Sequence, residues 1–194
     1  MRMARKYEFQ PDKPYSNWLA KLQLTKLQQR QVLKWGLYAL LMILLSVFQD
    51  VVLCRLRFFG GTTDLVPCGI FLICVLEGSH QGSVFSLVAS VLYLLSGSAP
   101  GPHALILITL LAILSSILRQ TFLQPTLLSA LLCTLLPMLV YESLVFAFCL
   151  LLGQVTFSRY LSFLVSAVLS PIAVPVLYLI AQPIMAVGGK SWKE

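Results

Sequence analysis

The stretch LLSALLCTLLPMLVYESLVFAFCLLL, from Leu127 to Leu152, contains one acidic residue and no basic one. A helix that crosses a bilayer needs about 20 consecutive apolar residues, so this stretch is long enough to span a membrane. The whole chain has the same character, with 58% apolar residues, 11% charged residues and a mean hydropathy of +0.87. Soluble domains usually carry about 25% charged residues. The sequence therefore predicts an integral membrane protein.

Five further apolar runs flank this stretch and extend the prediction to a compact all-α bundle of six transmembrane helices. Counted along the chain, the second run (63–76) and the third run (82–95) are short for full spans. A run of about 10–14 residues can instead be re-entrant. The polar linker Glu77–Gly82 between them favours two short helices packed inside the bundle. We expect Pro137 to kink the quoted stretch, and Pro171 and Pro175 to bend or break the last run, because proline removes a backbone donor. The five runs are 35–54, 63–76, 82–95, 103–118 and 160–181.

The distribution of basic residues orients these six runs. Cytoplasmic segments of membrane proteins carry an excess of Lys and Arg. With six spans, the basic N-terminus, Arg119, Lys190 and Lys193 all fall on the cytoplasmic side, so we expect both ends of the chain in the cytoplasm. Of the 14 Lys and Arg residues, seven precede residue 31 and Lys34 follows directly; the seven are Arg2, Arg5, Lys6, Lys13, Lys21, Lys26 and Arg30.

Three segments follow from this arrangement: a basic cytoplasmic N-terminal segment over 1–31, a membrane domain over 32–185 and a short cytoplasmic tail over 186–194. In the first segment, Trp18, Leu19 and Leu22 share one helical face, which is typical of an interfacial helix. A flexible tail leading into the first span fits the same residues, and both interpretations stay open. The basic residues there are expected to contact anionic lipid headgroups rather than nucleic acid.

The chain is poor in side chains that perform chemistry. It has two His residues, no HExxH zinc motif and no glycine-rich phosphate loop after a strand. Its five Cys residues are odd in number and form no CxxC pair, so we expect neither a disulfide framework nor a zinc site. The sequence predicts a protein that is not an enzyme and has no catalytic residues, no cofactor and no metal.

Glu142 is the polar residue that most needs an explanation, because it lies near the middle of the quoted stretch with Tyr141 beside it. A charge at the bilayer centre costs several kcal/mol, so such residues usually face the bundle interior or a cavity. Two interpretations stay open: a polar contact to a substrate, a proton or a partner helix, or a neutral or hydrogen-bonded glutamate that locks helix packing.

Asp50 and Asp64 flank the first outer loop, which also contains Arg55 and Arg57. We expect ion pairs between these acidic and basic residues at the membrane interface. Asp64 also opens the second run, where a negative charge suits the positive end of the helix dipole.

The third run and the turn after it carry a family resemblance. Residues 82–101 read GSVFSLVASVLYLLSGSAPG and resemble the central signature of the MreD family, the rod-shape-determining membrane proteins of bacteria. Tyr93 stands where that family usually has an aspartate. Two further segments resemble the family. Thr63–Leu65, which contains Asp64, resembles the start of its second helix. Val168–Pro171, which ends with Pro171, resembles a segment of its last helix. Within the signature, the matching positions are Gly82, Ser96, Gly97, Ser98 and Gly101.

The resemblance covers roughly residues 35–185 and implies a function. It implies a non-enzymatic membrane scaffold of the peptidoglycan elongation machinery in the bacterial cytoplasmic (inner) membrane, with a role in rod cell shape. That machinery couples MreB filaments, through MreC, to the glycosyltransferase RodA and its class B penicillin-binding protein. The resemblance therefore implies an MreC-like partner.

MreD-like proteins also resemble, in their six-helix architecture, the substrate-binding S components of ECF-type vitamin transporters. This similarity defines an alternative function, the capture of a small molecule from outside. It requires an outward pocket with converging polar or aromatic groups. Nothing in the spacing of the candidate residues predicts that they converge; the candidates are Tyr93, Tyr141, Glu142, His103 and Arg159.

Overall fold

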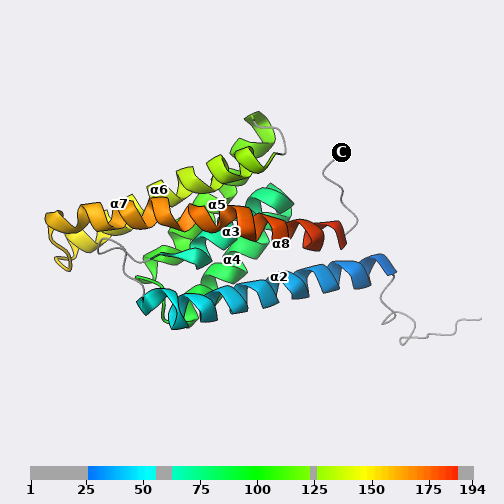
Figure 1. Ribbon diagram of the computed structural model, residues 1–194, viewed down its shortest axis with the longest axis horizontal. Coiled ribbons are helices and arrows are strands. Elements are labelled where there is room, and N and C mark those ends of the chain that lie inside the picture. The colour runs from blue at the N-terminus through cyan, green and yellow to red at the C-terminus, as the bar shows by residue number, and fades with distance from the viewer. Residues whose placement is uncertain (1–25, 56–62, 123–125, 188–194) are drawn as a thin grey trace, which may run out of the picture.

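The computed structural model describes residues 26–55, 63–122 and 126–187, and every regular element in these ranges is a helix (Figure 1). The prediction of an all-α membrane protein is confirmed, since four helical stretches are long and apolar enough to cross a membrane. These four are Gln29–Val51, His103–Thr121, Leu127–Leu151 and Phe157–Val187, and the shorter apolar helices are Leu65–Glu77 and Ser79–Leu95.

The long stretches contain α2 (Lys26–Val51), α5 (His103–Phe122), α6 (Leu127–Leu151) and the pair α7 (Tyr160–Leu169) and α8 (Val174–Val187). The short helices are α3 (Leu65–Glu77) and α4 (Ser79–Leu95), and 3-10 turns lie at Leu53–Arg55, Phe157–Arg159 and Ser170–Ala173. The N-terminal segment with Trp18, the residue Arg57 and the C-terminal residues 188–194 lie outside the described ranges.

Helix α3 forms the centre of the bundle. All 13 of its residues are buried, and it packs against α2, α4, α5, α6 and α8. At 1.5 Å per residue it is about 20 Å long, which is less than the ~30 Å hydrocarbon core of a bilayer. Because protein rather than lipid surrounds it, α3 does not need the length of a lipid-facing span. The expectation of a short helix packed inside the bundle is confirmed for α3, whereas α4 exposes one apolar face, with Val84, Leu87 and Val88 each more than half exposed.

Helix α4 begins earlier than we expected, and the predicted polar linker Glu77–Gly82 is wrong. Helix α3 ends at Glu77 and α4 begins at Ser79, so Gly78 alone reverses the chain. Its φ of 89° lies in a region that glycine adopts at little cost, and its N–H donates to the carbonyl of Cys74 at 3.1 Å. This one-residue connection brings α3 and α4 side by side.

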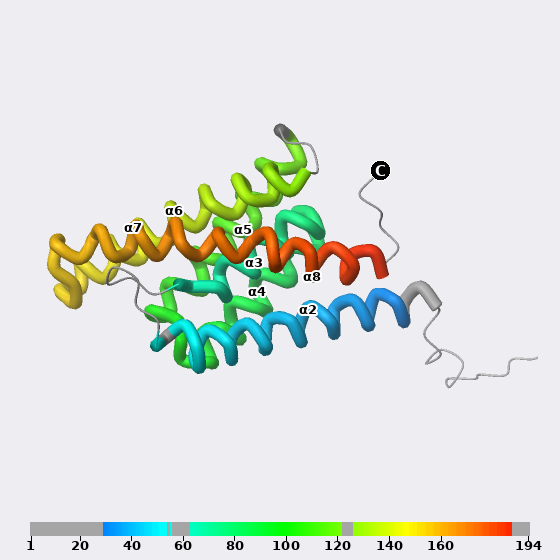
Figure 2. Tube along the Cα trace, viewed as in Figure 1, coloured from blue at the N-terminus to red at the C-terminus, as the bar shows by residue number. Residues whose placement is uncertain are grey.

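The last apolar run is broken where its prolines predicted. A 3-10 turn at Ser170–Ala173, with Pro171 at its start, separates α7 from α8. Figure 2 shows the two helices continuing along the length of the bundle, and α7 packs on α6 while α8 packs on α2 and α3. In contrast, α6 runs through Pro137 without interruption.

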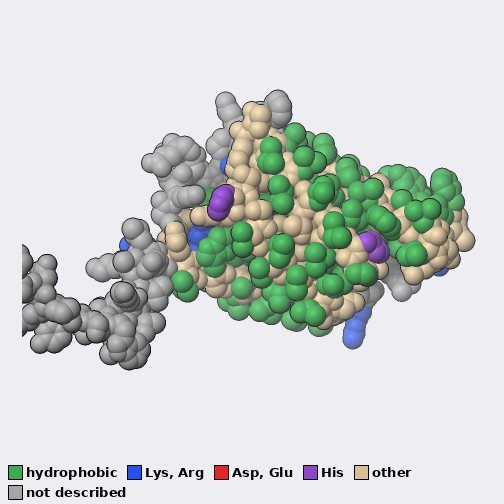
Figure 3. Space-filling model, turned by 180° about the vertical axis from the view of Figure 1, so that it is seen from behind, with side chains coloured by type: hydrophobic (Ala, Val, Ile, Leu, Met, Phe, Trp, Pro, Cys, Tyr) green, Lys and Arg blue, Asp and Glu red, His purple; other side chains and the backbone are tan. Residues whose placement is uncertain are grey.

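The outside of the bundle is apolar. Ile106 on α5, Leu128 on α6 and Val176 on α8 each expose at least 60% of their surface, and one whole face is covered mainly by hydrophobic side chains (Figure 3). Such a surface suits contact with lipid. The start of α2 and the end of α8 lie at the same end of the bundle (Figure 1).

Candidate functional site

Two carboxyl groups meet deep in the bundle where α3 begins. Asp64 directly precedes α3, and its side chain hydrogen-bonds with that of Glu142 from α6. Glu142 is only 4% exposed and also accepts a hydrogen bond from Ser166 Oγ on α7 at 3.3 Å. The two carboxyl groups therefore lie in direct contact inside the bundle.

The start of α3 is held by a serine rather than by its own aspartate. The backbone N–H of Asp64 donates to Ser170 Oγ at 2.9 Å, and Ser170 Oγ donates to the carbonyl of Ser166 at 2.8 Å. Asp64 precedes the helix as predicted, but its side chain makes no capping hydrogen bond and contacts Glu142 instead.

Two buried tyrosines adjoin this carboxyl pair. Tyr93 of α4 and Tyr141 of α6 are 2% and 0% exposed, and their side chains lie close to each other and to Asp64. The hydroxyl of Tyr93 donates to the carbonyl of Ser98 at 3.3 Å. The hydroxyl of Tyr141 has no partner with regular hydrogen-bond geometry among the described residues. The Tyr141 hydroxyl instead interacts with the hydroxyl of Tyr93.

A polar cavity of about 330 Å³ opens beside the carboxyl pair. Asp50 at its rim accepts a hydrogen bond from Ser98 Oγ at 2.7 Å, and Thr63 Oγ1 has no partner in the described part of the chain. The cavity lies between the end of α2, the start of α3 and the turn after α4; its lining residues are Gln49, Asp50, Thr63, Asp64, Ser96, Gly97 and Ser98.

Most of the residues that the sequence singled out meet at this place. The buried cluster contains Glu142, Tyr141, Tyr93 and Asp64. The cavity beside it is lined by Ser96, Gly97 and Ser98 as well as by Asp64. Pro171 directly follows Ser170, the serine that holds the backbone of Asp64.

Other predicted residues lie elsewhere. Gly82 packs α4 against α3, and Gly101 lies against the ring of His103, which itself stacks on Phe148 at 5.1 Å. Arg159 is exposed. The ion pair that we expected between Arg55 and Asp50 or Asp64 is absent from the described residues, where Asp50 contacts Ser98 and Asp64 contacts Glu142.

Sequence reasoning missed the three residues that complete the cluster, namely Gln49, Ser166 and Ser170. Gln49 is 5% exposed and accepts a hydrogen bond from the N–H of Val66 at 2.9 Å. It therefore pairs a backbone donor in the first turn of α3 that has no carbonyl partner within the helix. Each of the three is a polar residue inside an apolar run. That position is the signal that could have found them, because a polar side chain in a membrane helix usually faces the bundle interior.

A second polar cluster occupies the opposite end of α3. Lys34 of α2 and Glu77 of α3 form a buried ion pair, and the hydroxyl of Tyr38 donates to Glu77 at 2.7 Å. Arg119 of α5 donates to the carbonyl of Val75. The sequence counts Lys34 with the basic residues before the first span, and the structure shows it buried against Glu77, which ends α3 and does not lie in a linker.

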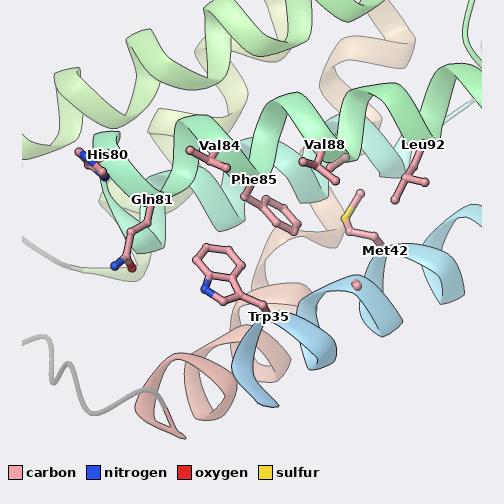
Figure 4. A pocket seen from close by; sticks show the side chains of 10 residues that line it. Trp35, Met42, His80, Gln81, Val84, Phe85, Val88 and Leu92 are labelled. Carbon is pink, nitrogen blue, oxygen red and sulfur yellow. The ribbon is translucent and has the colours of Figure 1, made fainter. Parts of the chain in front are cut away.

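An apolar groove of about 500 Å³ lies between α2 and α4 (Figure 4). Trp35 and Phe85 stack at its floor with ring centroids 5.8 Å apart, while His80 and Gln81 lie at one end and Leu92 at the other. A lipid-facing groove of this kind is expected to fill with whatever apolar chain adjoins it, so it assigns no specific function.

Comparison of the chain with protein-family models, curated proteins and solved structures finds no match. In the described residues, no group of three His, Cys, Asp or Glu side chains is placed to hold a metal ion. The arrangement can therefore be described as a buried, hydrogen-bonded carboxyl pair that opens onto a polar cavity.

The carboxyl pair makes a direct prediction about Glu142. Glu142→Gln keeps a hydrogen-bonding group for both Asp64 and Ser166, so we expect a loss of less than about 1 kcal/mol of stability. Glu142→Leu leaves Asp64 buried without its partner and is expected to cost about 1–3 kcal/mol. The free energy of unfolding, measured by titration with sodium dodecyl sulfate in mixed micelles, checks both values.

Ala147→Leu is the control, because it places a leucine at an exposed position of the same helix. Unchanged stability of Glu142→Leu would show that the pair does not lock the helices.

Proposed function

We propose that this protein is a non-enzymatic membrane scaffold of the bacterial peptidoglycan elongation machinery that contributes to rod cell shape. One observation supports the proposal above the others. The positions that resemble the MreD family extend from Asp64 to Pro171 in the sequence, yet most of them gather around one buried site. A resemblance that reflects a common architecture predicts this kind of convergence.

The departure from the family pattern at Tyr93 is compatible with the proposal. Tyr93 lies in the same cluster as Asp64, which precedes α3, and Glu142 of α6, so acidic groups stand near the position where the family has its aspartate. The site therefore keeps an acidic character although Tyr93 itself carries no carboxylate.

The proposed partner is an MreC-like protein, which would connect this chain to MreB, RodA and a class B penicillin-binding protein. Helix association in lipid depends on close packing and polar contacts, and the apolar outer faces of α5, α6 and α8 are available for it. To test this, the tagged protein is extracted from its native membrane in a mild detergent, with an unrelated six-helix protein carrying the same tag as the control. We expect an MreC-like protein to co-purify, and depletion of the chain to make rod-shaped cells round. Absence of both effects would rule the proposal out.

The proposal includes six membrane crossings with both ends in the cytoplasm, and reporter fusions test this orientation. Green fluorescent protein fluoresces only when it is fused on the cytoplasmic side, whereas alkaline phosphatase is active only on the outer side. We expect fluorescence from a fusion after Glu194 and phosphatase activity from a fusion after Gly101. An active phosphatase after Glu194 would place the C-terminus on the outer side and contradict this topology.

A second candidate function is the capture of a small molecule from outside, as in the S components of ECF-type vitamin transporters. The observation that favours it is the polar cavity of about 330 Å³ beside the carboxyl pair. Thermal stabilisation of the purified protein by a vitamin, without co-purification of an MreC-like protein, would favour this function over the scaffold.

A further inference from the structure

We propose that the connected ends of α6 and α7 form a hinged hairpin that swings away from α3 and α5. This distal hairpin comprises residues 138–169, and its hinge consists of Pro137 in α6 and the 3-10 turn Ser170–Ala173 between α7 and α8. The inference goes beyond the scaffold function and does not depend on it, because it concerns a movement within this chain and not an assembly partner.

The two parts of the hinge lie side by side. Helices α6 and α7 run antiparallel, and Glu142 accepts a hydrogen bond from Ser166 Oγ at 3.3 Å. Phe146 lies one turn further along α6, and its ring contacts that of Phe163 on α7 with centroids 5.5 Å apart. The same register, continued in the other direction, puts Pro137 opposite the 3-10 turn, which packs on α6. Both legs of the hairpin therefore have their hinge at the same level.

Prolines weaken both legs at this level. A proline inside a helix has no N–H to donate to the carbonyl four residues earlier, so the helix lacks one hydrogen bond there. In α6, Pro137 leaves the carbonyl of Cys133 without this donor. In the other leg, Pro171 and Pro175 remove two such donors within five residues. Sharp helix kinks occur at proline, and domain hinges use a few residues at the ends of elements.

The distal hairpin has few neighbours in the bundle. Among the described elements, α7 packs extensively only on α6 and on the 3-10 turns at its own ends. The connection between α6 and α7 lies beyond the ends of α2 and α4 (Figure 1). Leu151 and Phe157 beside this connection are 83% and 74% exposed. A segment that packs mainly on itself can move as one body at a low cost in buried contacts.

Two contacts hold the hairpin against the bundle in this structure. Glu142 contacts Asp64 at the start of α3. The ring of Phe148 stacks on His103 at the start of α5, with centroids 5.1 Å apart. Glu142 and Phe148 both lie on the hairpin side of the hinge, so a rotation about the hinge separates both pairs. Because Asp64 also lines the polar cavity, this rotation opens the cavity toward the space that Glu142 leaves.

Distances between nitroxide spin labels test the movement in the full-length protein, reconstituted in lipid nanodiscs. The tip pair carries labels at Ser158→Cys, on the hairpin, and Val47→Cys, on α2, because both positions are exposed. The reference pair combines Val47→Cys with Leu110→Cys on α5, an exposed position outside the hairpin. A protein without introduced cysteines measures any labelling of the native ones.

The length of the hairpin sets the size of the signal. From Pro137 to Leu151 it extends 14 residues along α6, which is about 21 Å, so a kink of about 20° moves its tip by about 7 Å. We expect the tip pair to show a second distance about 7 Å or more from the first, and the reference pair to show one distance. His103→Ala removes the ring stack and is expected to raise the population of the second distance at least twofold.

Proline variants connect the movement to the hinge. Pro137→Ala and Pro171→Ala each restore a backbone donor to one leg, and we expect each to lower the population of the second distance at least twofold. Either variant is sufficient if the other folds poorly. Pro183→Ala is the matched control, because Pro183 is an exposed proline in α8 outside the hinge, and it should keep the starting distribution. All three are measured in whichever protein, wild type or His103→Ala, shows the second distance.

The outcomes separate as follows. A second distance that occurs only in His103→Ala supports a hairpin that is closed at rest. The proposal fails if the tip pair is as narrow as the reference pair in both the wild type and His103→Ala. It also fails if the folded variants Pro137→Ala and Pro171→Ala behave like Pro183→Ala, since the movement would then not use this hinge. Failure of the wild-type protein to co-purify with an MreC-like protein would reject only the scaffold function.

Discussion

Replacing Lys34 with methionine is expected to destabilise the bundle by about 3–5 kcal/mol, because it leaves a buried carboxylate without its cation. The side chains of Lys34 and Glu77 are only 4% and 1% exposed, so water cannot replace the lost partner. Tyr38 still donates to Glu77 at 2.7 Å, but one neutral donor does not compensate a buried charge. The contact of Lys34 Nζ with the ring of Trp35, 5.7 Å from its centroid, is lost as well. Titration with sodium dodecyl sulfate measures the change in unfolding free energy.

The double variant Lys34→Met with Glu77→Gln separates this explanation from a simple loss of packing. It removes both charges and keeps an acceptor for Tyr38, so we expect it to recover most of the stability lost in Lys34→Met. Arg30→Met is the matched control, since Arg30 is an exposed basic residue one turn earlier on α2, and it should change stability by less than about 0.5 kcal/mol. If Lys34→Met matched the control, the ion pair would have no structural role.

The helices themselves could be predicted because lipid requires every backbone group to be paired within a span. The predicted run 127–152 agrees with α6, Leu127–Leu151, and the predicted run beginning at 103 agrees with the start of α5. The predicted helix boundaries are wrong where polar residues extend a helix beyond its apolar part. Helix α2 begins at Lys26 and not at Trp35, and α4 begins at Ser79 and not at Gly82. Apolar length locates a span but does not show where its helix begins.

The buried ion pair could not be predicted from the pattern of charge. Lys34 and Glu77 are 43 positions apart and come from different helices, and each has an ordinary explanation on its own. Lys34 adds to a basic cytoplasmic segment, and Glu77 ends an apolar run. The predicted topology nevertheless puts both at the same end of neighbouring apolar runs, so the pair could have been proposed as a contact.

The candidate site could be predicted only in part, because it depends on the depth of α3 in the bundle. Glu142 was recognised from its position in an apolar run. It lies nine residues before the end of α6, or about 14 Å along the helix. Asp64 reaches it because α3 has only 13 residues and starts well inside the bundle. Since sequence alone does not give the depth at which a short helix begins, the pairing of the two carboxyl groups was missed.

Replacing Gly82 with alanine is expected to destabilise the protein by about 2–3 kcal/mol, because α3 and α4 touch through their backbones at this residue. A Cβ atom on Gly82 would lie 2.9 Å from both the Cα and the carbonyl oxygen of Cys74, and 2.6 Å from its Sγ. A substitution at Cys74 would remove the sulfur. The backbone atoms of Cys74 can move away from the new Cβ atom only if the two helices separate. The helices have little freedom to do so, since Gly78 alone connects them. Thermal unfolding in detergent measures the loss.

Two further variants decide whether backbone contact is the cause. Gly36→Ala is the matched control, because a Cβ atom there meets nothing within 4 Å, and in helix α2 it should stabilise by up to about 1 kcal/mol. The double variant Cys74→Ala with Gly82→Ala removes the sulfur and leaves the backbone clash, so we expect no recovery relative to Gly82→Ala. Full recovery would place the strain in the Cys74 side chain. A Gly82→Ala protein as stable as Gly36→Ala would show that α3 and α4 are not in backbone contact, and the glycine that opens the MreD-like signature would then need an explanation other than helix packing.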